Sequence, residues 1–193
     1  MLKLYLAPGT SSFATHIALN EIGTPYEIEA LNFATKDTQS PGYLAINPEG
    51  KVPALSIDGR VLTEVAATLY YLARKHPEAK LWPEGDIEAE AQVLSWMSFT
   101  ASTLHPSRAL GPERMQLVFG QANRRLGSKE WAVGGRYSIA DIHLFRVYWR
   151  FCSGLQNPEQ FTALEAHQAR MLARPAVKKT MEIEQKISDR QAK

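Results

Sequence analysis

Two adjacent serines, Ser11 and Ser12, occupy a position at which serine can do chemistry. They follow the Pro8-Gly9 break and stand at the start of a predicted helix. A hydroxyl group and the free backbone N–H groups of a helix N-terminus can together stabilise a bound anion, a thiolate among them. The commonest duty of serine at this position is instead to cap the helix. For each serine, the sequence leaves both interpretations open.

The histidines and the single cysteine give weaker evidence of a functional site. His105 ends a predicted helix, where a histidine either lines a site or simply favours the helix dipole. Cys152 stands alone, so it cannot form an internal disulfide, which fits a reducing compartment such as the cytosol. The other histidines show no spacing typical of metal ligands, and we therefore expect no metal site. They are His16, His76, His143 and His167.

The elements that must position these residues begin with a βαβ unit. Residues 2–7 form a short apolar run that ends at Pro8-Gly9, which is typical of a buried strand followed by a turn. Helical spacing over residues 12–22 stops at Gly23. Residues 26–31 alternate apolar and acidic side chains, which predicts a strand that returns beside the first by a crossover.

A ββα unit follows. Asp58-Gly59 separates two short apolar runs, residues 54–57 and 60–63, and such a dipeptide is a strong hairpin signal. An amphipathic helix is predicted from Val65 to about residue 76. The first 76 residues therefore predict a small α/β domain.

The second half changes character, because helical periodicities dominate after Trp82. We place a linker at residues 77–86 and predict two domains, residues 1–76 and residues 87–193. An apolar stripe predicts a first helix that ends near His105, and Ser138 with Asp141 predicts a capping box. Further helices are expected at residues 112–126, 138–153, 159–172 and 175–188.

Composition bounds the function. The 22 basic and 20 acidic residues give a net charge of +2, which provides no field of the kind that nucleic acid or an anionic membrane requires. The N-terminal apolar stretch is too short for a signal peptide, and no run approaches the roughly 18 to 20 apolar residues of a spanning helix. We expect a cytoplasmic protein with no nucleic-acid or membrane partner.

Short strings along almost the whole chain carry a resemblance to one family. In order they are Lys3-Leu4-Tyr5, Asn47–Leu55, Thr63-Glu64, Tyr137–Asp141 and Leu172–Pro175. Their order and spacing resemble those of the cytosolic glutathione S-transferases, and Leu104-His105 adds a similarity to the bacterial beta-type enzymes. The resemblance implies a thioredoxin-like βαβ-ββα domain with an all-helical domain, a homodimer, and glutathione as co-substrate without a metal.

The resemblance also implies a site. The glutathione thiolate is expected beside Ser11 or Ser12, and a small apolar electrophile beside His105. Residues implied to hold the tripeptide are Tyr5, Lys36, Val52, Pro53, Glu64 and Val65.

Each of these roles has a plainer alternative. Val52-Pro53 resembles a pair in which a cis proline turns the preceding backbone toward the peptide of glutathione. An ordinary trans turn is the commoner state, but the resemblance of the flanking residues predicts cis. Glu64 matches a residue at the glutamyl end, but an acid at a helix start also favours the dipole. Lys36 matches a partner of the glycyl carboxylate, or is a solvated loop lysine. Tyr5 is the second choice of hydroxyl, or a core residue.

Two residues depart from the beta-type pattern. Ser11 stands where those relatives usually have cysteine, and serine cannot form a mixed disulfide with glutathione. Val65 replaces a serine that grips the glutamyl carboxylate, and the loss of a hydrogen bond to a charged group costs about 1.5 to 3 kcal/mol. We therefore expect direct conjugation and weak glutathione binding. The alternatives are a binding protein without turnover, or a dehalogenase or ether-cleaving enzyme with the same glutathione site.

Overall fold

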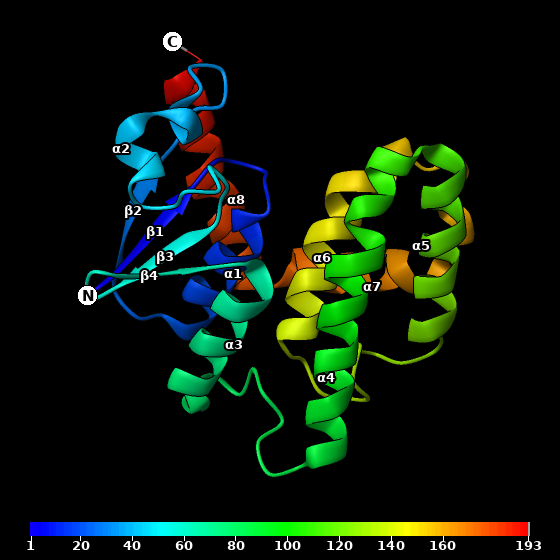
Figure 1. Ribbon diagram of the computed structural model, residues 1–193. Coiled ribbons are helices and arrows are strands. Elements are labelled where there is room, and N and C mark those ends of the chain that lie inside the picture. The colour runs from blue at the N-terminus through cyan, green and yellow to red at the C-terminus, as the bar shows by residue number, and fades with distance from the viewer. Residues whose placement is uncertain (193) are drawn as a thin grey trace. The chain divides into compact units, whose positions relative to one another are not determined.

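The computed structural model describes residues 1–192, and Figure 1 shows the order of their helices and strands. The strands are β1 (Leu2–Leu6), β2 (Tyr26–Ala30), β3 (Ala54–Ile57) and β4 (Arg60–Thr63). The helices are α1 (Ser12–Ile22), α2 (Pro41–Leu44), α3 (Val65–Lys75), α4 (Ile87–Phe99), α5 (Pro112–Leu126), α6 (Ile139–Phe151), α7 (Thr162–Ala173) and α8 (Pro175–Gln191).

The chain packs as two compact units. One contains residues 1–72 together with α8, and the other contains residues 73–174. The first holds the sheet and the second is all-helical, so the predicted fold class of a thioredoxin-like α/β half with an all-α half is confirmed. Within the described residues, no helix is both long and apolar enough to cross a bilayer.

The sheet has the strand order β2-β1-β3-β4. β1 and β2 are parallel and are joined through α1, which is the predicted βαβ crossover. β3 is antiparallel to both β1 and β4. Asp58 and Gly59, between β3 and β4, both have positive φ, as a type I′ hairpin turn requires. The predicted hairpin is therefore confirmed.

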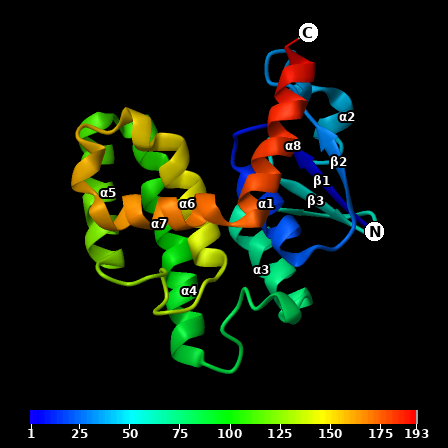
Figure 2. The ribbon, with the colours of Figure 1, turned by 180° about the vertical axis from the view of Figure 1, so that it is seen from behind.

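Helix α8 packs beside α1 in the first unit, and Figures 1 and 2 show the two running side by side. The Asn20 amide donates to the Thr180 hydroxyl at 2.8 Å, and His16 bonds Glu184. This last helix was expected in the helical half, whereas it packs on α1 in the unit that holds the sheet. The domain limits of 1–76 and 87–193 stay predictions, because a division into compact units does not by itself define domain limits.

The helical unit is organised around α6. Trp96, Phe119, Phe145 and Tyr148 fill its core. The predicted capping box at the start of α6 is present. The Asp141 carboxylate accepts the Ser138 N–H at 2.9 Å, and the Ser138 hydroxyl accepts the Ala140 N–H at 3.3 Å. The predicted first helix of this half ends in a π-helical turn at Thr100–Leu104, directly before His105.

Candidate active site

One end of the sheet gathers the segments that carry the predicted site. Leu6 at the end of β1 lies opposite Ala30 at the end of β2. Tyr5 lies opposite Ala54 at the start of β3, and Ala54 in turn lies opposite Thr63 at the end of β4. The loops that leave or enter the sheet here therefore share one edge. They carry Ser11, Lys36, Val52, Pro53, Glu64 and Val65.

The two serines at the start of α1 have different environments. The Ser12 side chain is fully buried, where its Oγ accepts the Ala7 N–H at 3.3 Å and lies 2.9 Å from the Thr10 hydroxyl. The Ser11 side chain is partly exposed and makes no capping bond. Over residues 1–192, no side chain or backbone group bonds its hydroxyl. Ser11 therefore offers a free donor at a helix N-terminus, and Ser12 does not.

The loop that carries Ser11 is held by a carboxylate from α8. Glu184 accepts the Gly9 N–H through Oε2 at 2.8 Å and bonds His16 Nδ1 through Oε1 at 2.9 Å. The other ring nitrogen of His16 lies 2.9 Å from the Tyr26 hydroxyl. Both Glu184 and His16 are buried. The carboxylate thus restrains a loop that is remote from it in sequence.

Glu184 was not among the predicted site residues, although the sequence carries a signal for it. Glu184 shares one face of α8 with Val177 and Thr180, which are both fully buried. An acid on a buried helix face must find partners, because burial of an unpaired charge is costly.

The Val52-Pro53 peptide bond is cis, as the sequence analysis predicted. The Val52 side chain packs into a small buried cluster that includes Tyr5 and Tyr43. The backbone of Val52, rather than its side chain, is thus the part that can serve a ligand at this edge.

Glu64 joins β4 to α3 with a φ of 67°. A non-glycine residue in the left-handed region is strained by about 1 to 3 kcal/mol, and such residues cluster at ligand-binding sites. Val65 follows as the first residue of α3 and is largely buried. Its side chain brings no polar group to the edge.

Tyr5 and Lys36 lie in contrasting settings. Tyr5 is buried in β1, with its ring centroid 5.8 Å from that of Tyr43. Of the two roles expected for Tyr5, a site hydroxyl or a core residue, this position is that of a core residue. Lys36 is exposed in a tight turn at φ 58° and forms no ion pair with any described residue. Its ammonium group is available to an anion.

His105 lies in the helical unit, half-buried. Burial, and then the positive charge of Arg146, lower the pKa of His105 to about 4, so its imidazole is neutral at pH 7. Its ring centroid lies 5.8 Å from that of Phe151, and the Arg108 guanidinium lies 5.3 Å from the same ring. The neutral ring can donate and accept a hydrogen bond but adds no charge.

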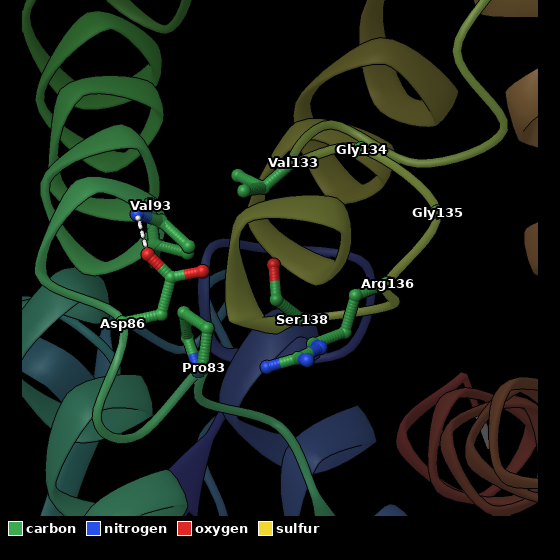
Figure 3. A pocket seen from close by; sticks show the side chains of 9 residues that line it. Pro83, Asp86, Val93, Val133, Gly134, Gly135, Arg136 and Ser138 are labelled. Atoms are coloured by element: carbon green, nitrogen blue, oxygen red, sulfur yellow. Dashed lines mark hydrogen bonds between the residues drawn. The ribbon is translucent and has the colours of Figure 1, made fainter.

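Figure 3 shows a separate cavity of about 420 Å³ within the helical unit. The Asp86 carboxylate lies at its rim and caps α4 by accepting the Ala89 N–H at 3.0 Å. Two of its polar lining residues, Asp86 and Ser138, cap helices, and none of the predicted site residues belongs to it. The lining residues are Pro83, Asp86, Ala89, Val93, Val133, Gly134, Gly135, Arg136 and Ser138.

Metal ligands are not grouped in the described part of the chain, where no three histidine, cysteine or acidic side chains could hold an ion. Cys152 is partly exposed, and burial raises the pKa of its thiol. A raised pKa makes this cysteine a poor nucleophile.

Comparison with known proteins decides the family. The model of the glutathione S-transferase N-terminal domain matches residues 1–74, and the model of the C-terminal domain matches residues 94–182. Glutathione S-transferase GstA of Escherichia coli O157:H7 is 31% identical over 199 residues, covering 95% of this chain and 98% of the relative. The chain belongs to the glutathione S-transferase family.

Solved glutathione S-transferases agree with this assignment. A glutathione transferase homologue from Sulfitobacter, crystallised with bound glutathione, matches with a TM-score of 0.88 and 33% identity over 94% of this chain and 97% of that one. A beta-class glutathione S-transferase from Sphingomonas chungbukensis matches with a TM-score of 0.84 and 31% identity over 94% and 98%. The predicted family and fold are confirmed, and the roles of individual residues stay predictions.

Proposed function

We propose that this glutathione S-transferase joins the sulfur of glutathione to a small apolar electrophile, with the Ser11 hydroxyl stabilising the thiolate. The family membership and the full-length relatives support the reaction class, and they do not favour the alternative of a binding protein without turnover. The observation that carries the role of Ser11 is its unbonded, partly exposed hydroxyl at the N-terminus of α1.

The chemical task is to keep the thiol of glutathione ionised near neutral pH. A free thiol has a pKa near 8.5, and lowering it by about 2 units requires roughly 2.7 kcal/mol of preferential stabilisation of the anion. One hydrogen bond from Ser11 Oγ to the sulfur, together with the positive end of α1, is of this size. The thiolate then forms a carbon–sulfur bond, and the leaving group departs with its electron pair.

Serine at position 11 selects the type of sulfur chemistry. It cannot form a disulfide with glutathione, so the site favours conjugation over thiol–disulfide exchange. The assignment of this position rests on the alignment of Lys3-Leu4-Tyr5 and His16 with the beta-type pattern.

The tripeptide would lie along the shared edge of the sheet. Its glutamyl end meets Glu64 and the Val65 N–H, its peptide meets the Val52 backbone, and its glycyl carboxylate meets Lys36. Since Val65 lacks a hydroxyl, the glutamyl carboxylate loses one hydrogen bond and glutathione binds weakly.

The remaining proposals come from the family resemblance. His105 would line the electrophile pocket as a neutral imidazole, the chain would act as a homodimer, and its setting would be the cytosol. No metal takes part in the proposed reaction.

The test combines retention on immobilised glutathione with turnover of a generic aromatic halide. We expect specific retention and glutathione-dependent release of halide. Absence of binding at millimolar glutathione would overturn the proposal, and binding without turnover of a panel of electrophiles would favour the binding-protein alternative instead.

A further inference from the structure

The carbonyl oxygen of Lys51 accepts two partly buried hydrogen bonds, immediately before the cis peptide at Val52-Pro53. The Tyr43 hydroxyl donates to it at 2.5 Å, and the Asn47 side-chain amide donates to it at 2.8 Å. Both donor residues are 3% exposed.

Both donors are themselves held in place. The Asn47 side-chain oxygen accepts the Glu49 N–H at 3.2 Å, which fixes the direction of its amide nitrogen. The Tyr43 ring packs against Tyr5, with ring centroids 5.8 Å apart. The Tyr43 backbone N–H donates to the Ser40 side chain, which caps α2. Neither donor can turn away from the carbonyl without disrupting other contacts.

The geometry of the peptide unit carries the consequence. The Lys51-Val52 peptide is planar and trans, so its C=O and N–H groups point in opposite directions. Two donors that hold the Lys51 oxygen toward the buried Tyr43 and Asn47 therefore direct the Val52 N–H the other way. One donor would satisfy the hydrogen-bonding need of the Lys51 carbonyl, whereas two donors fix the orientation of the peptide plane.

We propose that Tyr43 and Asn47 are positioning residues that aim the Val52 backbone at the peptide group of glutathione. This inference rests on the proposed function, since it presumes that glutathione binds along this edge. The two residues touch neither the sulfur nor the electrophile, so they act on binding of the tripeptide and not on the chemical step.

The test uses Tyr43→Phe, which removes the hydroxyl but keeps the ring packing. We expect the Kd for S-methylglutathione and the KM for glutathione to rise about 3- to 10-fold, the size of one neutral hydrogen bond. We expect kcat and the pKa of the bound glutathione thiol to stay at their wild-type values. Asn47→Ala should act in the same sense, and the double variant should weaken binding by more than the product of the two single effects.

Tyr148→Phe is the matched control. Tyr148 is a buried tyrosine of the helical unit whose hydroxyl bonds Glu165, so this variant also loses one hydroxyl bond and some stability. We expect it to bind S-methylglutathione as the wild type does. A Tyr43→Phe variant with wild-type affinity, or with weakened binding no greater than that of Tyr148→Phe, would overturn the inference. A wild-type protein that binds no S-methylglutathione would instead overturn the proposed function.

Discussion

The side chains of Ser11 and Ser12 differ in burial, and burial decides what each hydroxyl can do. The Ser12 hydroxyl is fully buried and bonds Ala7 and Thr10. The Ser11 hydroxyl is partly exposed at the start of α1. Their types and spacing could not separate the two, because the difference arises from how residues 7–12 turn at the end of β1.

Ser11→Ala should raise the pKa of the bound glutathione thiol by about 1 to 2 units, because the anion loses a hydrogen bond worth about 1.5 to 3 kcal/mol. Ultraviolet difference spectra of the bound thiolate against pH provide the measurement. Ser12→Ala is the matched control, for which we expect an unchanged thiol pKa and a loss of about 1 kcal/mol in the free energy of unfolding. The opposite outcome for the two variants would assign the role to Ser12.

Val65→Ser should tighten glutathione binding about 10-fold, because it adds a hydroxyl at the first residue of α3, where we place the glutamyl carboxylate. Isothermal titration with glutathione measures the effect. Val65→Ala loses the same apolar contacts without gaining a hydroxyl, so the comparison of Ser with Ala isolates the hydrogen bond. Equal affinities of these two variants would contradict the proposed position of the carboxylate.

At the scale of elements, the parts of the fold that depend on local signals could be predicted from sequence. The Asp58-Gly59 turn and the Ser138-Asp141 capping box are set by residues a few positions apart, and both are present. The packing of α8 could not be predicted, because an amphipathic helix shows which face is buried and not what covers it. Glu184 was missed for the same reason.

Glu184→Leu should lower the free energy of unfolding by about 2 to 5 kcal/mol, because His16 Nδ1 and the Gly9 N–H lose their partner in a buried place. Urea unfolding provides the measurement. Glu184→Gln keeps one oxygen acceptor and replaces the other by an NH2 group of similar size, so we expect a smaller loss of unfolding free energy. Equal stability of Glu184→Leu and the wild type would show that Glu184 of α8 does not hold the loop that carries Ser11.

His143 in α6 should make the protein sensitive to acid. Burial, and then Arg146 and His105, lower the pKa of His143 from 6.5 to about 3, so the unfolded chain binds this proton more readily than the folded chain. Stability is therefore full above pH 6.5 and falls as the pH drops from 6.5 toward 3, by about 2 kcal/mol at pH 5 from this group.

His143→Leu should reduce the difference in unfolding free energy between pH 7.5 and pH 5 by this amount. Urea unfolding at the two pH values measures it, and the other titrating groups are present in both proteins. An unchanged difference would contradict the buried, neutral state of His143.

At the scale of the whole molecule, the family resemblance predicts a homodimer. Sedimentation at micromolar concentration should give twice the mass of the 21.6 kDa chain. A single 21.6 kDa species at that concentration would contradict the predicted homodimer. It would not contradict the proposed glutathione site, since every residue proposed to hold the tripeptide lies in the first unit of one chain.

The central claim is that the edge of the sheet binds glutathione and ionises its thiol. A pH titration of the wild-type protein with saturating glutathione, followed by thiolate absorbance, tests it most directly. We expect bound thiolate to appear with a pKa about 2 units below the value near 8.5 of a free thiol. A bound thiol that titrates like free glutathione would contradict the account.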